Sequence, residues 1–535
     1  MNSRAGLGVG PLSNCSMATE GSHLCTYLEA SASRHPRRFA AFDPDGTALT
    51  YEELNQRANR VAGFLVNQGV RPGDRVGLVM PKTTMTFTAL FGIMKARAAY
   101  VPIDWTGPLE RTRSILTSCQ VRVVLADPRC QGLSGTAEAV VPLDAVTWDR
   151  ILQCEPLETD ATARRPDDLA YILYTSGSSG IPKGVMTTQR NATSYVDWCS
   201  GLFGASQEDR FGNHAPFHFA MSIVDIFLPI KHGGSVHLVP EDLGKNPREL
   251  ASFIGKQRLT VWYSTPAILG LLAEHGNLNR VDCSSLRLVL FAGEAFPIKK
   301  LRRIMEVWPA PAYYNLWGST ETNACTYLPI PKPIPAERTE PYPIGKAGSH
   351  CSALVLDDDA MPVAQGQEGL LYLSGPSVFP GYWGRETVFL DRDGLRWHNT
   401  GDVVRELENE GFVYVGRRDR MVKRRGYRIE LGEVERGLYQ HPAVTEAAAI
   451  AFQDNELGTR IIAYLVAPQE PRPSMVEMKT FCNQHLPVYM NPDVFVFIEV
   501  LPRTRSNKVD YQALIRRVQA EEKEKGLRRG QSSQP

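Results

Sequence analysis

The chain has 535 residues, of which 43% are hydrophobic and 22% charged, so its composition is that of a globular protein too long for one core. A formal net charge of +1 gives no argument for nucleic acid or an anionic membrane as a partner, and no apolar run reaches the length of a membrane span. The start of the chain lacks the apolar segment of a secretion signal, and the 10 cysteines form no CxxC motif or His/Cys cluster along the sequence. We therefore expect a cytoplasmic enzyme of two or three domains.

Helix and strand patterns alternate through the first part of the chain. Residues 1–20 are rich in Gly and Ser and are expected to form a disordered tail, in which Met17 is a second candidate start. The predicted elements that follow are, in order, a helix at 23–35, a helix within 47–70 with Thr50 as its N-cap, a strand at 75–80, a helix at 84–96 and strands at 98–104 and 121–127. This alternation predicts a layered α/β domain.

A loop rich in Gly, Ser and Thr follows the strand-like run Tyr171-Ile-Leu-Tyr174. Its glycines permit positive φ and close approach to a ligand, while its hydroxyls and backbone N–H groups can face phosphate oxygens. The loop residues predicted to hold a polyphosphate are Thr175, Ser176, Gly177, Ser178, Ser179, Gly180 and Lys183. Gly184 follows the lysine, so this is not the GxxxxGK[ST] P-loop. The preceding strand and the Pro-Lys-Gly that closes the loop disfavour a plain flexible linker.

The rest of the chain divides into a longer and a shorter part. We expect a helix at 221–230 beneath a substrate pocket, strand-then-turn units at 260–269, 286–297 and 313–328, and a small β-barrel-like subdomain at 344–415. A basic run begins at Gly416, followed by helices at 431–441, 475–485 and 511–521 and strands at 447–452 and 460–467. The predicted organisation is a disordered tail (1–20), an N-terminal core (21–415), a hinge (416–419), a small, mobile α+β C-terminal domain (420–521) and a polar tail (522–535).

Taken together, these stretches resemble the adenylate-forming superfamily of acyl-CoA synthetases, luciferases and nonribosomal peptide synthetase adenylation domains. Eight motifs occur in the order and spacing of that family: LTYEEL (49–54), KARAAYVPID (95–104), YTSGSSGIPKG (174–184), NLWGSTET (315–322), TGDV (400–403), GRRDRMVKRRGYRIELGEVE (416–435), LPVYM (486–490) and NKVD (507–510). The resemblance is closest to the adenylation domains and covers about 25–518. It implies a multi-layer α/β fold, in which a large N-terminal domain of layered sheets and helices carries a small C-terminal lid that rotates about a hinge.

The resemblance also implies an ATP-dependent, AMP-forming ligase with Mg²⁺ as its metal. In such an enzyme the loop at 175–183 holds the β- and γ-phosphates, Glu321 holds Mg²⁺ and Thr320 contacts the α-phosphate. The other implied ATP-binding residues are Asn315 and the backbone of Gly293, Glu294 and Ala295 at the adenine edge, Trp317 stacking on adenine in place of the usual Tyr, Asp402 at the ribose hydroxyls and Arg417 at ribose or phosphate.

By the same resemblance, the catalytic lysine is Lys508, in a Ser-Asn-Lys sequence where the family usually has Asn-Gly-Lys. It enters the site when the lid closes and bridges the substrate carboxylate and the α-phosphate; read in isolation, it would be a solvated charge. Asp419 matches the hinge, which lets the lid swing to a second pose for thiol attack. The pair Lys299-Lys300 and the basic run at 417–428 are interpreted as solvated surface, part of which can meet an acidic carrier protein.

The informative departure from the family lies at 217–227. Members that activate α-amino acids normally carry Asp after the Phe, where its carboxylate pairs with the α-ammonium, but this chain has Ala220. A buried ammonium without a counter-charge costs several kcal/mol. Asp225, five residues on, is either a buried carboxylate that caps a neighbouring loop or a relocated counter-ion for an amino group one carbon further from the carboxyl. The second interpretation resembles free-standing β-amino-acid adenylation enzymes of polyketide (antibiotic) pathways.

The remaining pocket positions suggest an apolar substrate side chain. The residues that align with the family's pocket, besides Ala220 and Asp225, are Met221, Val224, Tyr263, Leu290, Ala292, Leu316, Ala324 and Cys325. We expect a β-amino acid such as a 3-amino fatty acid or an aryl β-amino acid. Its acceptor is expected to be the phosphopantetheine thiol of a separate acyl or peptidyl carrier protein, with CoA remaining open.

Three alternatives stay open at this point. An acyl- or aryl-CoA ligase also lacks the α-ammonium Asp, although Asp225 in an apolar wall argues against it. An α-amino-acid adenylation enzyme is the second. A catalytically silent adenylation-like protein is the third, and it is disfavoured because every motif charge is present: Lys183, Glu321, Asp402 and Lys508.

Overall fold

A computed structural model gives the arrangement of the chain. It describes residues 23–158, 161–177, 182–418, 420–454, 458–468, 471–503 and 509–531, of which 161, 245 and 522–531 are described without their side chains. The predicted tail at 1–20, together with Ser178, Ser179, Gly180, Asp419 and Lys508, lies outside the described residues.

The largest sheet has nine strands in the order β15-β14-β13-β12-β11-β9-β10-β1-β2. Its strands are β1 (Phe39–Phe42), β2 (Ala48–Thr50), β9 (Arg210–Asn213), β10 (Ser235–Leu238), β11 (Val261–Ser264), β12 (Leu288–Phe291), β13 (Ala312–Ser319), β14 (Asn323–Pro329) and β15 (Lys346–Ala347). The central strands from β1 to β13 pair in parallel, whereas β13, β14 and β15 pair antiparallel. Parallel strands are buried on both faces, which explains why β10, β11 and β12 are fully buried.

A second sheet has six strands in the order β6-β5-β3-β4-β7-β8. Its strands are β3 (Arg75–Val79), β4 (Ala99–Pro102), β5 (Val123–Ala126), β6 (Ala139–Pro142), β7 (Leu169–Thr175) and β8 (Lys183–Thr188). All of its pairs are parallel except β7 with β8, which form an antiparallel hairpin. The tip of that hairpin is the Gly/Ser loop predicted to hold phosphate.

Helices fill the space between and around these two sheets. They are α1 (Leu24–Arg34), α2 (Tyr51–Asn67), α3 (Thr84–Lys95), α4 (Leu109–Ser118), α5 (Ala145–Leu152), α6 (Gln189–Phe203), α7 (Ser222–His232), α8 (Pro247–Lys256), α9 (Pro266–His275) and α10 (Ile298–Val307). A capping box between Thr50 and Glu53 starts α2, as the sequence predicts for Thr50. Helix α3 is buried all round, which its uniformly apolar sequence requires. One large core cluster includes side chains of both sheets and of α1, α2, α3, α6 and α7.

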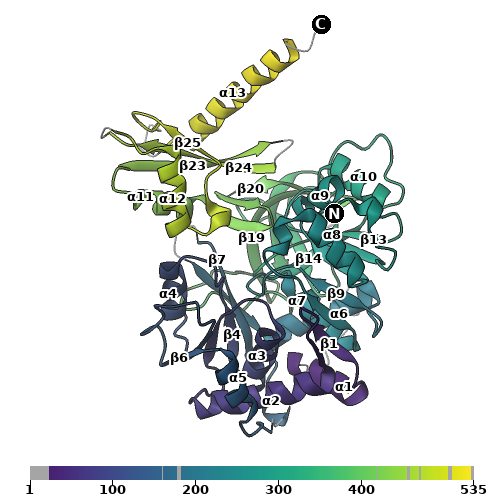
Figure 1. Cartoon of the computed structure of the whole chain (residues 1–535). Helices are drawn as coiled ribbons and strands as arrows, with labels where there is room; N and C mark the ends of the chain where they lie inside the picture. The colour runs from purple at the N-terminus through teal and green to yellow at the C-terminus, as the bar shows by residue number, and fades with distance from the viewer. Residues whose placement is uncertain are drawn as a thin grey trace, which may run out of the picture.

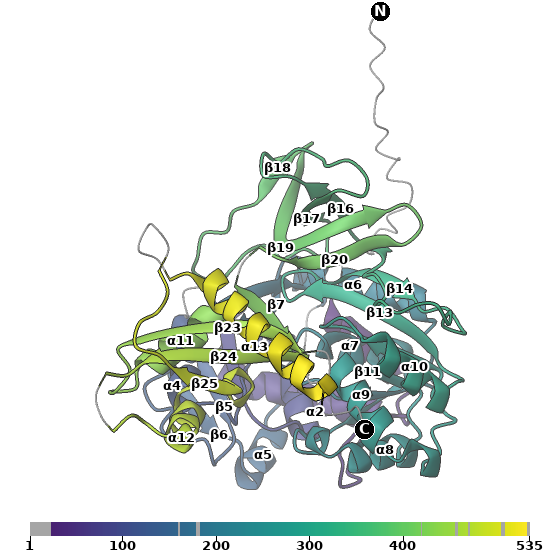
Figure 2. The same cartoon turned by 90° about the horizontal axis from the view of Figure 1, so that it is seen from above.

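The region predicted as a β-barrel-like subdomain forms a five-stranded antiparallel sheet. Its strands are β16 (Ser352–Leu356), β17 (Glu368–Ser374), β18 (Leu390–Arg392), β19 (Leu395–Leu407) and β20 (Gly411–Arg417). Seen from above, this sheet forms a layer of its own beside β13 and β14 (Figure 2). Its buried side chains pack with Trp317 and Cys325 of β13 and β14 in a single cluster.

The C-terminal part is a smaller unit that lies at one end of the molecule, above α4 and β7 (Figure 1). It consists of the hairpin β21 (Met421–Arg424) and β22 (Tyr427–Glu430), the three-stranded sheet β23 (Glu446–Asp454), β24 (Gly458–Val466) and β25 (Val494–Phe497), and the helices α11 (Leu431–Tyr439), α12 (Met475–His485) and α13 (Tyr511–Gln531). Apolar clusters cover both faces of the three-stranded sheet, so this unit has its own core.

The predicted fold class, a layered α/β chain with a large N-terminal and a smaller C-terminal part, is confirmed. Two elements differ from their predictions. The unit at 313–328 is a β13–β14 hairpin, with the turn returning along the same sheet edge. Helix α13 continues to Gln531, past the predicted end at Glu521, because Glu, Lys and Arg are good helix formers. The domain boundaries stay predictions.

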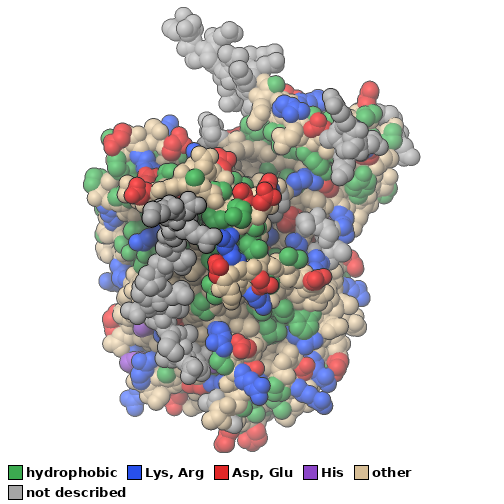
Figure 3. Space-filling view, turned by 180° about the vertical axis from the view of Figure 1, so that it is seen from behind, with side chains coloured by type: hydrophobic (Ala, Val, Ile, Leu, Met, Phe, Trp, Pro, Cys, Tyr) green, Lys and Arg blue, Asp and Glu red, His purple; other side chains and the backbone are tan. Residues whose placement is uncertain are grey.

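On the face of the molecule seen from behind, acidic and basic side chains are interspersed rather than gathered by sign (Figure 3). This mixture agrees with the net charge of +1. Among the helices of the described residues, none combines the length and apolarity that crossing a membrane would require.

Candidate functional site: a carboxylate and arginine cluster under the hairpin

The predicted phosphate loop is held at both ends by the β7–β8 hairpin, in which Thr175 pairs with Lys183. The Thr175 hydroxyl is buried and has no hydrogen-bond partner in the described part of the chain. The Lys183 ammonium lies 5.6 Å from the ring centroid of Tyr382, and burial lowers its pKa. Ser176 ties the loop to the C-terminal part, because its hydroxyl donates to Arg428 O at 2.8 Å and accepts from Glu430 N at 3.1 Å.

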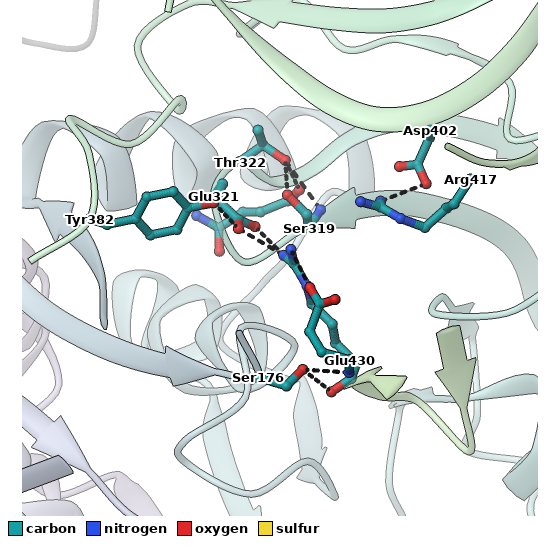
Figure 4. Close-up of polar contacts among 10 residues, drawn as sticks. Ser176, Ser319, Glu321, Thr322, Tyr382, Asp402, Arg417 and Glu430 are labelled. Carbon is teal, nitrogen blue, oxygen red and sulfur yellow. Dashed lines mark hydrogen bonds and ion pairs between the residues drawn. The ribbon is translucent and has the colours of Figure 1, made fainter. Parts of the chain in front are cut away.

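Glu321 lies in the turn between β13 and β14 and is only 2% exposed. Its carboxylate accepts from Arg428 Nη1 at 2.7 and 2.8 Å and from the Tyr382 hydroxyl at 2.7 Å (Figure 4). Burial alone would raise the pKa of this carboxyl, but Arg428 and the Tyr382 hydrogen bond hold it well below its usual range. Glu321 is therefore a buried, ionised carboxylate, the kind of oxygen donor that Mg²⁺ prefers. Thr320, beside it, is half-buried.

A second buried carboxylate, Asp402, lies on β19 opposite Arg417 of β20. Its Oδ1 accepts from Arg417 Nη1 at 2.8 Å, as Figure 4 shows. Its Oδ2 is buried and meets no hydrogen-bond donor among the residues that the structure describes. A buried acceptor oxygen without a donor is costly unless a ligand supplies one. The hydroxyls of a ribose would fit this atom, in keeping with the predicted role.

The hairpin β21–β22 reaches into the site, and its basic residues do not all face solvent. The Lys423 ammonium lies 5.3 Å from the ring centroid of Trp317, and the Arg428 side chain is 17% exposed beside Glu321. Arg424 is buried and hydrogen-bonds to Tyr489 O and Asn491 O. The interpretation of 417–428 as solvated surface was therefore wrong for these residues. Lys423 and Arg424 are neighbours on β21 and point to opposite faces, and both faces are covered, one by Trp317 and the other by the segment that contains Tyr489 and Asn491.

The residues predicted at the adenine edge lie within β13 and just after β12. Asn315 and Trp317 are buried on β13; the Asn315 amide donates to Pro343 O at 2.8 Å, and Trp317 Nε1 has no partner in the described ranges. Gly293, Glu294 and Ala295 follow β12. Burial raises the pKa of Glu294 to about 7. The backbone N–H groups of Gly426 and Arg425 lower this pKa, but by less than burial raises it.

Gly426, in the β21–β22 turn, makes a close contact with the N-terminal part. It has φ +82°, and a Cβ there would lie 2.4 Å from Thr265 Cγ2. A Cβ at Gly293, which has φ +99°, would lie 3.4 Å from Gly426 Cα. Only a glycine at 426 lets the turn approach this closely.

Most of the predicted pocket residues share one apolar cluster. Val224, Tyr263, Leu290, Ala292, Leu316 and Ala324 are buried in the main core, and Ala220 and Met221 pack against it. Cys325 is the exception, because it belongs to the cluster around Trp317 and the five-stranded sheet. Ala324 and Cys325 are neighbours on β14, so their side chains point to opposite faces. Cys325 is therefore not brought to the same wall as the other pocket residues.

Asp225, on α7, is 1% exposed, and neither carboxylate oxygen has a hydrogen-bond partner within the described residues. Burial raises its pKa well above the ordinary value. The Lys82 ammonium and the Asn213 amide lower the pKa, but neither makes a hydrogen bond of ordinary geometry to it. Lys82 instead donates to the backbone oxygens of Asn213 and His214, both at 2.9 Å. Asp225 does not cap a neighbouring loop.

Sequence reasoning missed Arg428, Lys423 and Tyr382. Arg428 and Lys423 stand in a quoted motif and are cross-strand partners that share one face of the β21–β22 hairpin, but the sequence does not say which way that face is turned. Tyr382 lies between β17 and β18, far along the chain from the loops it joins, and nothing in the local sequence marks it. The interpretation that the chain has no His/Cys cluster is also wrong in space, since Cys325, His350 and Cys351 come together.

Comparisons with known proteins agree with this geometry. Residues 28–383 match the family model described as AMP-binding enzyme, and residues 433–508 match the model of the AMP-binding enzyme C-terminal domain. The chain belongs to the AMP-binding enzyme family. The predicted adenylate-forming superfamily is thereby confirmed, and this member is an AMP-forming ligase.

Curated relatives and a solved structure cover nearly the whole chain. An L-proline--[L-prolyl-carrier protein] ligase of Pseudomonas fluorescens is 37% identical over 91% of this chain and 98% of its own length. A protein of the same name from Streptomyces coelicolor is 36% identical over 90% of this chain and 94% of its own. An artificially fused adenylation–PCP di-domain, NpsA-ThdA from Klebsiella oxytoca, shares the fold with a TM-score of 0.78 at 22% identity, covering 89% of this chain and 94% of that one.

Proposed function

We propose that this enzyme activates a β-amino acid with an apolar side chain as its aminoacyl-AMP and passes it to the phosphopantetheine thiol of a separate carrier protein. The names of the curated relatives support amino acid activation and a carrier protein as acceptor. Asp225 and Ala220 support an amino group on the β-carbon of the substrate, and the names of the two relatives support a carrier protein as the acceptor.

The first half-reaction joins two anions, the substrate carboxylate and ATP, so the site must neutralise charge. Lys183 and Arg417, which lie outside the β21–β22 hairpin, would supply positive charge to phosphate oxygens in this step. Glu321 would hold Mg²⁺, whose charge offsets that of the phosphate oxygens. Asp402 Oδ2 would accept from the ribose, and the Trp317 ring would stack on adenine.

The docked hairpin supports a two-pose cycle. In this structure Arg428 donates hydrogen bonds to both oxygens of the Glu321 carboxylate, and Gly426 lies against Thr265. Adenylation needs Glu321 for the metal, so the hairpin must leave during that step and return for thiol attack. Lys508 is proposed to enter when the hairpin leaves, as the lid rotates about Asp419. We assign the docked pose described here to the transfer half-reaction.

The single observation that carries the substrate class is the unpaired carboxylate of Asp225. A carboxylate that is 1% exposed and lacks donors among the described residues is unstable as an anion unless a ligand pairs with it. A substrate ammonium would supply both the opposite charge and N–H donors. Since position 220 is Ala, the ammonium is expected at the β-carbon rather than at the α-carbon.

A second candidate is an α-amino or α-imino acid, favoured by 36–37% identity to two L-proline--[L-prolyl-carrier protein] ligases. The two candidates differ in where the nitrogen meets a carboxylate. ATP–pyrophosphate exchange over a panel of β-amino acids, L-proline, other α-amino acids and acids without an amino group separates them directly. We expect the highest kcat/KM with a β-amino acid.

The variant Asp225→Asn keeps the side-chain shape and removes the charge. It is expected to reduce kcat/KM for the β-amino acid by roughly 100-fold or more, because a buried ammonium then lacks its partner. Asp197→Asn is the matched control, since Asp197 is a partly buried carboxylate on α6 that pairs with Lys231. Exchange that is fastest with L-proline, or unaffected by Asp225→Asn, would refute the β-amino acid assignment. Transfer assays with CoA and with a holo carrier protein test the acceptor separately.

A further inference from the structure

Two cysteines and a histidine from separate segments meet behind the substrate wall. Cys325 lies on β14, and His350 and Cys351 lie in the turn between β15 and β16. Two sulfur atoms and one ring nitrogen of these residues all lie within 4.8 Å of one another. Cys325 is fully buried and His350 is 5% exposed. The spacing of these three residues along the sequence does not match a metal-binding motif, because the fold brings them together.

The tautomer of His350 follows from its one backbone contact. Its Nε2 lies 3.0 Å from the carbonyl oxygen of Ala324, so Nε2 carries the proton and donates it. The other nitrogen, Nδ1, then has a bare lone pair, and it is buried with no hydrogen-bond partner in the described residues. The ring is also fixed in orientation by stacking on Trp198, with centroids 4.3 Å apart. Metal-binding histidines typically show this arrangement, with one ring N–H on a carbonyl and the other nitrogen facing the metal.

Gly348 packs closely against the stacked rings of His350 and Trp198. A Cβ at this position would lie 2.7 Å from His350 Nδ1 and Cε1 and from Trp198 Cε2, so a larger residue would displace the imidazole from its present orientation. Among the described residues, the partners of the two thiols are weak. Cys325 Sγ lies 3.3 Å from Thr322 O and 3.7 Å from Ser377 Oγ, and Cys351 Sγ lies 3.2 Å from Cys325 O and 3.6 Å from Gly348 O.

We propose that Cys325, His350 and Cys351 form a binding site for a thiophilic divalent cation, with Zn²⁺ as the ion of choice. Thiolate sulfur and imidazole nitrogen are the ligands that Zn²⁺ prefers, and tetrahedral bonds of about 2.0–2.3 Å place ligand atoms roughly 3.5–4 Å apart. A small closure of the present spacing therefore reaches the required geometry. A water or the Ser377 hydroxyl would complete the four-coordinate shell.

The role of such an ion would be structural. It would tie β14, which carries Ala324 on the predicted substrate wall, to the turn that leads into β16 of the five-stranded sheet. Binding releases the thiol protons and adds a cross-link between two sheets that already share an apolar cluster and the backbone pairing of Gly345 with Phe412. The site uses soft ligands, unlike Glu321, the residue proposed to hold Mg²⁺, whose carboxylate oxygens are hard.

The test uses the full chain, purified with any affinity tag removed, incubated with Zn²⁺ and freed of loose metal by gel filtration. Elemental analysis is expected to find an equimolar amount of zinc in the wild type and a large loss in Cys351→Ser and in His350→Gln. Cys130→Ser is the matched control, because Cys130 is a partly buried thiol outside the cluster, and it is expected to keep the metal. Substitution by Co²⁺ should give a thiolate-to-cobalt charge-transfer band in the wild type and in Cys130→Ser.

A readout on the wild type alone guards against variants that fail to fold. Bound Zn²⁺ is expected to slow alkylation of Cys351, which is partly exposed, but not of Cys130. A wild type that retains no zinc and shows no cobalt band overturns the proposal. So does a Cys325–Cys351 disulfide in the peptide map of freshly purified protein, or zinc that persists in folded Cys351→Ser.

Discussion

One guanidinium nitrogen of Arg428 donates to both oxygens of the Glu321 carboxylate, at 2.7 and 2.8 Å. The two residues stand on different parts of the molecule, Glu321 in the β13–β14 turn and Arg428 on the hairpin of the C-terminal part. The carboxylate assigned to Mg²⁺ is thus held by an arginine while the hairpin is docked. Docking of the hairpin and metal binding at Glu321 are therefore expected to exclude each other.

The first prediction concerns Arg428→Ala. Removal of this arginine deletes a charged hydrogen-bond pair worth about 1.5–3 kcal/mol that exists only in the docked pose. The rate of acyl transfer from preformed adenylate to the thiol is expected to fall roughly 10- to 100-fold, while pyrophosphate exchange changes by less than about 3-fold. Single-turnover transfer and exchange assays on the same preparation measure the two rates.

Arg425→Ala is the control for that variant, because Arg425 lies on the same hairpin and is exposed. It is expected to leave both half-reactions close to wild type. If Arg428→Ala slows exchange as much as transfer, the arginine serves both poses and the assignment of this pose fails.

The second prediction is that Gly426→Ala blocks docking by shape alone. The new Cβ would lie 2.4 Å from Thr265 Cγ2, and the residue would have to keep φ +82°, which costs an L-residue about 1 kcal/mol. Transfer is expected to fall at least 10-fold with exchange preserved. Gly458→Ala is the matched control, since Gly458 also has a positive φ (+76°) and a Cβ there meets nothing within 4 Å. Normal transfer in Gly426→Ala would show that the close contact is not needed.

How far the sequence predicts this fold depends on the distance between the residues involved. Local signals succeeded: Thr50 caps α2 as predicted, and the helix predicted at 475–485 is α12, since caps and apolar periodicity act within a few residues. The end of α13 was missed, because a polar Glu/Lys/Arg segment is equally compatible with helix and with coil when no apolar face decides.

Motifs that carry their own chemistry let candidate site residues be named from the sequence, and the roles of those residues stay predictions. Glu321, Asp402 and Lys183 stand in such motifs, and the structure places them around one cluster of charges. Arg428 and Tyr382 could not be assigned in that way, because their role depends on which way a hairpin faces and on a contact across 61 residues of chain. The grouping of His350 with Cys325 has the same origin: it is tertiary, and one-dimensional spacing does not encode it.

The third prediction is that Lys508→Ala abolishes adenylate formation and spares transfer from preformed adenylate. The lysine is proposed to stabilise the charge that develops between the substrate carboxylate and the α-phosphate, and removal of such a preorganised charge typically costs a factor of about 100–1,000. Pyrophosphate exchange and single-turnover transfer are compared, with Arg516→Ala, an exposed cation on α13, as the control. Equal loss in both half-reactions would contradict the role.

The fourth prediction follows from the pKa of Asp225, which burial raises and Lys82 only partly lowers. A substrate ammonium binds the ionised carboxylate, so binding releases the proton that the free enzyme holds at Asp225. The KM for the β-amino acid is therefore expected to rise as the pH falls below that raised pKa, by up to about tenfold per pH unit. KM against pH is measured for the wild type and Asp225→Asn, with the KM for ATP as the internal control. A pH dependence that survives in Asp225→Asn would assign the titration to another group.

The same carboxyl makes a prediction for stability without substrate. The pKa of Asp225 is higher in the folded chain than in the unfolded chain, where it is about 4. At pH values between these two pKa values, the folded state therefore binds more protons than the unfolded state. As the pH rises through this range, ionisation of Asp225 lowers the free energy of unfolding. Asp225→Asn removes this loss of stability, so the Tm of the variant minus the Tm of the wild type is expected to increase as the pH rises. Saturating β-amino acid should raise the Tm of the wild type and not that of Asp225→Asn. A Tm difference independent of pH, or equal stabilisation of both proteins, would mean that the carboxylate at 225 does not receive the substrate nitrogen.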